Sequence, residues 1–311
     1  MRTGRGGEVA AGLLLDALFG EPPEELHPTV WMGRAISAYE KRALPTKNPH
    51  ARRLAGVVLA CALPTLVYLS VRVALGVAPG PLRRVSGAAL ISTALSMRGL
   101  GEAAGAVERE LRGDDLERAR ARISEMVGRD TENLSAPEVS RAAVESVAEN
   151  ASDGVVAPML YGLLFGAPGA LAYKAINTLD SMVGYRKGPY AEFGWGSARL
   201  DDLANLAPAR ATALAVAVVS GRPVRTLEAA RRYGPLPASP NAGWAEAAFA
   251  GALGLRLGGP NAYGGVVRQG PTLGDGRLPG PADVRRAVRL MRRCCALVAG
   301  IAVAAGGPRR G

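Results

Sequence analysis

Three short stretches of the chain gather acidic, amide and basic side chains beside apolar runs. The first contains Glu145, Glu149, Asn150 and Asp153. Carboxylates next to a membrane segment are costly unless they are paired or bind a metal. Carboxylate and amide oxygens suit Mg²⁺, which proteins usually hold with one or two carboxylates and the phosphates of a substrate. The alternatives are a salt-bridged stripe with Arg141, at helical spacing from Glu145 and Glu149, and capping of a helix end by Asn150 or Asp153.

The second stretch begins at Asn177 and contains Asp180, Arg186 and Lys187 within about two to three helical turns. A carboxylate beside two cations is the mixture of charges that Mg²⁺ and a phosphate group together require. The stretch therefore predicts a second part of a phosphate site.

The third stretch joins Arg199 to two consecutive acids, Asp201 and Asp202, with Trp195 before them and Asn205 after them. Paired carboxylates can bind a cation, and one of them can accept a proton from a substrate. A surface network of ion pairs is the alternative interpretation of these residues.

The elements that must position these residues are mostly apolar. The longest apolar run, residues 54–78, exceeds the roughly 20 residues that a bilayer core requires. Basic residues precede it, and by the positive-inside rule that flank is cytoplasmic. Further spans or hairpins are expected near residues 85–97, 155–176, 207–221 and 290–305.

The run at residues 155–176 is broken in its middle by Gly166-Ala167-Pro168-Gly169. Proline lacks a backbone donor, and glycine permits a sharp turn, so we expect a helical hairpin rather than one span. A hairpin returns the chain to the side from which it came. The polar stretches before and after it could then meet in one site.

The remaining segments are more polar. Residues 108–122 are charged and predict one solvated surface helix. Ser135 followed by Glu138 forms a capping box, which predicts a helix over about residues 137–149. Residues 222–283 are rich in glycine and proline and are expected to form loops.

Composition supports a mixed membrane protein. Hydrophobic residues make up 48% of the 311 residues, whereas the mean hydropathy is only +0.09. The net charge is +11, but its cations are spread without interleaved aromatics, which argues against a nucleic-acid module. Neither the cysteines nor the two histidines have metal-site spacing, and we expect no cleaved signal peptide, because Asp16 interrupts the first apolar stretch. We expect a single all-α, integral membrane domain over residues 1–311, with short or broken transmembrane helices and cytoplasmic helical segments.

Five blocks resemble the adenosylcobinamide-phosphate synthase family of cobalamin biosynthesis, and they occur in the family's order over nearly the whole chain. They are Leu15-Asp16 with Gly20-Glu21-Pro22-Pro23, His27-Pro28 and Gly33-Arg34; residues 145–158; residues 173–208; Ser239-Pro240-Asn241-Ala242-Gly243-Trp244; and Gly258-Gly259-Pro260-Asn261-Ala262-Tyr263-Gly264-Gly265.

The resemblance implies a multi-pass protein of the inner (cytoplasmic) membrane, with a cytoplasmic active site, that joins adenosylcobyric acid to aminopropanol or aminopropanol phosphate. ATP with Mg²⁺ would activate the corrinoid carboxylate, and the amine would then form an amide. Cobalt would enter only within the substrate. Other cobalamin-assembly enzymes in the membrane are candidate partners, and nucleic acid is not one.

With this resemblance we assign site residues as follows. The metal ligands are Glu149, Asp153 and Asp180; the residues that bind ATP add Glu145, Asn150, Asn177, Arg186 and Lys187; and the catalytic group is Arg199, Asp201 and Asp202. Asn205 and Asn241 are expected to bind corrin amides or ribose, and Trp195, Trp244 and Tyr263 to pack on the macrocycle. His27 is expected to be structural.

The chain lacks a Walker-type phosphate loop, because residues 162–169 do not end in Gly-Lys-Ser/Thr. ATP use therefore follows from the resemblance alone. The competing interpretation is a non-catalytic membrane scaffold or permease that binds the corrinoid. A permease should contain several uninterrupted apolar spans, whereas only residues 54–78 form a clean one.

Overall fold

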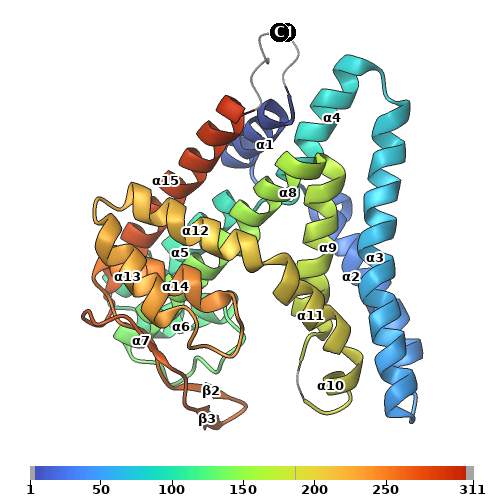
Figure 1. Cartoon of the computed structure of the whole chain (residues 1–311). Coiled ribbons are helices and arrows are strands. Elements are labelled where there is room, and N and C mark those ends of the chain that lie inside the picture. Colours follow the sequence, from blue (N-terminus) through green and yellow to red (C-terminus); the bar gives the residue numbers. More distant parts are fainter. Residues whose placement is uncertain (1–3, 186, 306–311) are drawn as a thin grey trace. The chain divides into compact units, whose positions relative to one another are not determined.

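The computed structural model describes residues 4–185 and 187–305, which are mostly helical, with four short strands (Figure 1). The expected all-α class is therefore confirmed. Contacts along the chain form two compact units. The first comprises Met1–Ser96, Ala157–Asn205 and Ala299–Gly311, and the second comprises Met97–Val156 and Leu206–Val298. The assignment of a single functional domain stays a prediction.

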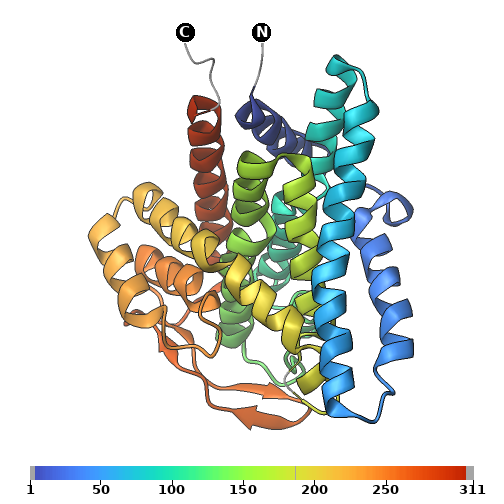
Figure 2. The same cartoon turned by 45° about the vertical axis from the view of Figure 1, so that its right-hand side comes forward.

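The first unit is built from helices. They are α1 (Arg5–Phe19), α2 (Pro28–Ala43), α3 (Pro49–Val77), α4 (Gly80–Ser92), α8 (Ala157–Phe165), α9 (Ala167–Val183), α10 (Tyr190–Phe193), α11 (Trp195–Ala204) and the end of α15 (Pro281–Ala305), with a 3₁₀ turn at Glu24–Leu26. The long helix α3 lies beside α9, and α2 packs against both (Figures 1 and 2).

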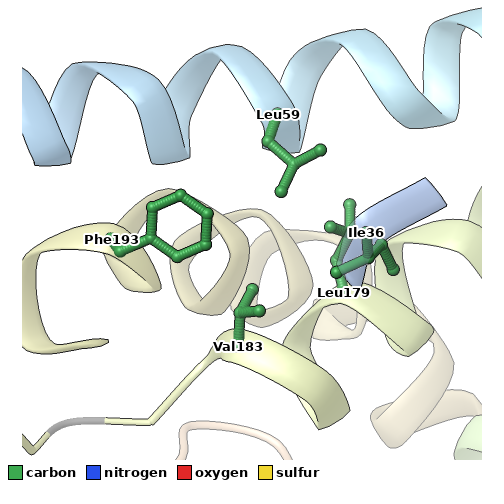
Figure 3. Packing of buried hydrophobic residues seen from close by; sticks show 5 residues of the cluster. All are labelled: Ile36, Leu59, Leu179, Val183 and Phe193. Carbon is green, nitrogen blue, oxygen red and sulfur yellow. The ribbon is translucent and has the colours of Figure 1, made fainter. Parts of the chain in front are cut away.

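A buried apolar cluster joins α2, α3, α9 and α10. In Figure 3 the side chains of Ile36, Leu59, Leu179, Val183 and Phe193 converge from these four helices, and none of them is more than 6% exposed. The close approach of α10 to α3 requires a glycine in α3, because a Cβ atom on Gly56 would collide with the Phe193 carbonyl oxygen. This packing fixes the end of α9, where the second polar stretch lies.

The predicted hairpin is confirmed. Helix α8 ends before Gly166, whose φ of 74° favours glycine, and α9 begins at the next residue. The two helices pack side by side, since a Cβ atom on Gly169 would lie 2.7 Å from the Tyr161 carbonyl oxygen. Helix α9 continues to Val183 beyond the expected end of the hairpin, and so carries Asn177 and Asp180 on a rigid element.

Among the described residues, α3 is the one single helix long and apolar enough to cross a membrane, and only 22% of its apolar window is buried. Helices α11 and α12 (Leu206–Val219) meet the same criteria only when taken together. The expected return leg at residues 85–97 is wrong in extent, because α4 ends at Ser92 after 13 residues. A turn follows the helix at residues 93–94, so the helical part of this segment is too short for a simple span.

The second unit contains eight helical segments and four strands among its described residues. They are α5 (Met97–Arg112), α6 (Leu116–Ser124), α7 (Ala136–Ala151), a π-helical turn (Ser152–Val156), α12, α13 (Pro223–Tyr233), α14 (Ala242–Leu253), most of α15, β1 (Leu257–Gly258), β2 (Asn261–Tyr263), β3 (Val266–Arg268) and β4 (Thr272–Leu273). The capping box of α7 is present as predicted, with Ser135 and Glu138 bonded to each other.

Two expectations for this unit were wrong. The single helix at residues 108–122 is split by a turn at Gly113, where Asp114 has a φ of 56° and Asp115 caps α6. The loops expected at 222–283 include two helices, α13 and α14. Alanine-rich sequence favours helix, and the glycine of this stretch is a packing point, since a Cβ on Gly251 would lie 2.7 Å from Ala229.

The strands form two antiparallel pairs, β1 with β4 and β2 with β3. The β2–β3 hairpin extends beyond α13 and α14 of its unit (Figure 2). The carboxylate of Asp130 accepts hydrogen bonds from the backbone N–H groups of Gly264 and Gly265, at 2.8 and 2.7 Å, which ties down the hairpin turn. Helix α15 begins at Pro281 rather than near residue 290, so the five arginines between residues 285 and 293 lie within the helix.

Candidate functional site

Asp180 and Asp201 form the centre of a polar cluster in the first unit. Asp180 lies in the last turn of α9 and Asp201 lies in α11, which packs against α9. Asn177, one turn before Asp180, and Asn205, one turn after Asp201, complete what we call the aspartate cluster. The second and third polar stretches of the sequence therefore meet in the first unit, whereas the expected meeting of the first stretch with them stays a prediction.

A buried tyrosine sets the orientation of this cluster. The hydroxyl of Tyr173 donates to Asn205 Oδ1 at 2.8 Å, and Asn205 Nδ2 donates to Asp201 Oδ2 at 3.0 Å. Tyr173 is fully buried and stacks on Tyr161 with ring centroids 5.0 Å apart. Because the tyrosine fixes which end of the Asn205 amide faces Asp201, the carboxylate is held in one position.

The electrostatics of Asp201 are unusual. Burial, as the larger cause, and the nearby Asp180 carboxylate together raise the pKa of this carboxyl to about 7. Hydrogen bonds from the amides of Asn205 and Asn177 lower this pKa. Asp201 Oδ1 is buried and makes no hydrogen bond of acceptable geometry among the described residues. A buried oxygen near a second carboxylate is suited to a proton or a divalent cation.

Of the other predicted residues of these two stretches, Arg199 and Asp202 pair with each other. Asp202 accepts from Arg199 Nη1 at 3.1 Å, and the Arg199 side chain is 55% exposed. This pair matches the surface ion network that was the alternative interpretation. Lys187 is exposed in a bend after α9. Arg186 lies outside the described residues.

The first polar stretch belongs to the second unit and takes part in a buried ionic network. Glu145 Oε2 accepts from Arg129 Nη2 at 2.5 Å, and both side chains are at most 10% exposed. Arg129 also donates to Asn261 Oδ1 at 2.5 Å, which Arg141 reaches from the other side at 2.9 Å. We call these four residues the arginine–glutamate network. The salt bridge between Arg141 and Glu145 that was the alternative interpretation is thus present, at 3.9 Å, but it is buried.

The network holds the loop before the β2–β3 hairpin. Arg141 donates to the carbonyl oxygens of Gly258 and Pro260, and Glu145 Oε1 accepts from the Gly258 N–H at 2.7 Å. Gly258 has a φ of 70°, and a Cβ atom there would collide with the Pro271 carbonyl oxygen. The start of the glycine-rich block at residues 258–265 is therefore a turn held by hydrogen bonds to charged side chains. Beside it lies a pocket of about 510 Å³ that Arg141 and this loop help to line.

Glu246 is a further acid next to the network. Burial raises its pKa well above the ordinary value, and the carboxylates of Glu145 and Glu149 add to the effect, while Arg129 and Arg141 oppose it. A carboxyl with a raised pKa can donate a hydrogen bond where an ionised one can only accept. Sequence reasoning missed this residue, although it is the one acid of α14 and stands in an otherwise apolar helix.

The predicted metal ligands divide between the two units. Glu149 is an exposed residue of α7 and Asp153 lies in the π-helical turn that follows, a feature that often marks functional sites. Asp180 belongs to the first unit. Asn150 donates to the Ser146 carbonyl within its own helix at 3.0 Å. No group of three His, Cys, Asp or Glu among the described residues is arranged to hold a metal ion, and the assigned metal set stays a prediction.

The three aromatic residues expected to contact a macrocycle each carry an arginine over the ring. The pairs are Arg53 on Trp195 at 4.1 Å, Arg210 on Trp244 at 4.7 Å and Arg268 on Tyr263 at 5.4 Å. Arg210 also donates to Asn241 at 2.7 Å. Trp195 and Tyr263 are about 40% exposed, so one part of each ring remains accessible.

His27 has the structural role expected of it. Its Nδ1 accepts from the Thr29 backbone N–H at 3.2 Å and caps the start of α2. Burial lowers the pKa of its imidazole. Sequence reasoning also missed Arg129 and gave Tyr173 no role. Arg129 lacked a signal because its partner Asn261 is 132 residues away, whereas Tyr173 begins a block that the resemblance had singled out.

Comparison with known proteins agrees with the family resemblance of the sequence. The chain is 46% identical over 309 residues to the cobalamin biosynthesis protein CobD of Geobacter metallireducens, covering 93% of both chains. It is 44% identical to the proteins of that name from Rhodobacter capsulatus, covering 87% of this chain and 86% of that one, and Mycobacterium tuberculosis, covering 91% and 90%. No solved structure matches the chain. The sequence model of the CobD/Cbib protein family matches residues 9–291, so this chain belongs to that family.

Proposed function

We propose that the chain is an enzyme of cobalamin biosynthesis that converts adenosylcobyric acid to adenosylcobinamide or its phosphate by forming an amide with aminopropanol or aminopropanol phosphate. Family membership supports the pathway. The observation that carries the reaction type is the aspartate cluster, where a buried carboxyl with a pKa near 7 lies near a second carboxylate.

The residues of this cluster fit a magnesium ion. The Asp201 oxygen without a hydrogen-bond partner and the repulsion between Asp201 and Asp180 would both be relieved by a divalent cation. Mg²⁺ needs only one or two protein carboxylates when phosphate oxygens supply further ligands. Mg-ATP would supply a phosphoryl group that turns the hydroxyl of the corrinoid carboxyl group into a leaving group.

The chain's own residues have two tasks in this proposal. Asp180 would hold the cation beside Asp201, and Asn205 with Tyr173 keeps Asp201 in place, so positioning supplies much of the rate enhancement. The amine must lose a proton as the amide forms, and an ionised carboxylate with a pKa near 7 is suited to accept it. Phosphate leaves as the C–N bond forms, and ADP is the second product.

The test is a ligation assay on purified protein with adenosylcobyric acid, Mg-ATP and either aminopropanol or its phosphate, in which corrinoid mass and ADP release are followed together. We expect a mass gain of one amide-linked arm that requires ATP and falls at least about 100-fold in Asp180→Asn. Asp114→Asn, at an exposed turn of positive φ, is the matched control and should keep full activity. Tight corrinoid binding with no mass gain from either amine would support the scaffold or permease instead.

We also propose that α3 is inserted in the membrane with its N-terminal flank in the cytoplasm. Its outer face exposes large apolar side chains, including Leu66, Val73 and Val77 at 60 to 82%. Lipid contact would remove this surface from water, whereas a core helix of a soluble protein would be mostly buried already. We expect the protein to stay with membranes through an alkaline carbonate wash and to leave them in detergent. Release by carbonate would contradict insertion.

A further inference from the structure

A second polar pocket lies in the second unit, between the end of α12, the start of α13, the end of α14 and the first half of α15. Its volume is about 400 Å³. Four arginines from two of these elements line it, namely Arg222, Arg286, Arg289 and Arg293, together with Ser220. We call it the arginine pocket.

The positive charge of this pocket is mostly uncompensated. Arg286 pairs with Asp283 at 2.8 Å, but Asp283 is shared with Arg277, which binds both of its oxygens at 2.7 and 2.9 Å. In the part of the chain that the structure describes, no carboxylate lies within 4.0 Å of a nitrogen of Arg222, Arg289 or Arg293. Several cations at one concavity repel each other unless an anion joins them.

The arrangement of these arginines follows from helix geometry. Arg286, Arg289 and Arg293 are three and four residues apart and share one face of α15. Arg285, on another face, is paired with Glu108 at 2.9 Å. Arg285 therefore forms an ion pair within the fold, whereas Arg289 and Arg293 line the pocket and have no carboxylate partner among the described residues.

We propose that the arginine pocket binds a phosphate group. Guanidinium groups donate paired hydrogen bonds whose spacing matches two oxygens of a phosphate. Four arginines offer more donors and more positive charge than one carboxylate, with its single negative charge, can satisfy. Arg222 approaches from the N-terminal end of α13 and the others from α15, so an anion in the pocket would join two helices that are far apart in sequence.

Two sources of a phosphate group fit this chemistry. One is a water-soluble phosphate ester or polyphosphate, and the other is the headgroup of an anionic phospholipid, which arginines close to an apolar helix segment commonly contact. The C-terminal half of α15, from Cys294 onward, is apolar. The inference concerns binding and stands independently of the proposed ligation.

The test compares wild-type protein with Arg289→Gln/Arg293→Gln. The matched control is Arg118→Gln/Arg122→Gln, which removes the same charge from two exposed arginines of α6 in the same unit. Pyrophosphate binding is measured by calorimetry in a neutral detergent. Retention of phosphatidylglycerol against phosphatidylcholine is measured by native mass spectrometry after release from mixed nanodiscs. Arg222→Gln, which changes the pocket from the α13 side, is measured alongside.

We expect the double variant and Arg222→Gln to weaken binding of one of these probes about tenfold or more, with the control unchanged. A loss confined to pyrophosphate identifies a soluble ligand, and a loss confined to phosphatidylglycerol identifies a lipid headgroup. Equal binding of both probes by wild type, pocket variants and control would overturn the proposal. Since neither readout depends on amide formation, failure of the ligation assay leaves this result interpretable.

Discussion

Asp201→Asn is expected to lower ligation at least about 100-fold and to make the folded protein more stable at pH 8. The activity falls because asparagine can neither accept a proton nor supply a negative oxygen to a cation. In the wild type, kcat/KM should fall as the pH drops below about 7, the pKa to which burial and Asp180 raise the Asp201 carboxyl. The residual activity of the variant should lack this dependence.

The stability gain follows from the direction of the pKa shift. The folded state binds the Asp201 proton more tightly than the unfolded state, where the pKa is about 3.8. The carboxyl therefore does not lower the free energy of unfolding at low pH. It lowers this free energy increasingly as the pH rises from about 4, and the full loss is reached above about 7. A shift of this size corresponds to at most about 4 kcal/mol, and asparagine avoids that cost.

Stability is measured by chemical denaturation at pH 5 and pH 8 without added Mg²⁺. Initial rates of ligation are measured with Mg-ATP between pH 5 and pH 8. Asp114→Asn is the control, because it removes an exposed carboxylate from a turn in the second unit, and we expect its rate and stability to match those of the wild type. The assigned role would be refuted if the Asp201→Asn protein were as active as the wild type. It would also be refuted if the stability that the variant gains over the wild type were smaller at pH 8 than at pH 5.

Glu145→Ala is expected to destabilise the protein by about 3–5 kcal/mol. Glu145 is the carboxylate that faces Arg129 at 2.5 Å and Arg141 at 3.9 Å, and all three side chains are at most 10% exposed. Its removal leaves two guanidinium groups buried with only amide and carbonyl partners. The same change also frees the Gly258 N–H, so the loop before the β2–β3 hairpin should loosen.

The free energy of unfolding is measured by denaturant titration in detergent, and the hairpin by hydrogen exchange at residues 258–268. The control is Glu125→Ala, which breaks a pair of exposed side chains and should cost less than about 1 kcal/mol. If Glu145→Ala costs no more than this control, the network does not stabilise the second unit.

The helix ends that the sequence predicted well are those set by local chemistry. Ser135 and Glu138 start α7 through hydrogen bonds within four residues, and Gly166 ends α8 because its positive φ is costly for other residues. Errors arose where packing decides. Helices α13 and α14 occupy a stretch rich in glycine and proline because Gly251 lets α14 approach α13. No signal close to that glycine in the sequence shows this contact.

The sequence by itself determined the helical class, the family and the residue types of the site, since these depend on composition, spacing and the order of the blocks. Only the tertiary structure joined Asp201 to Asp180 and Asn205 to Tyr173, and only it buried Glu145 between two arginines. These contacts link residues from 16 to more than 100 positions apart. Burial raises the pKa of Asp201 and makes the Glu145 pair strong, and burial is a property of the packed chain that residue identity alone does not determine.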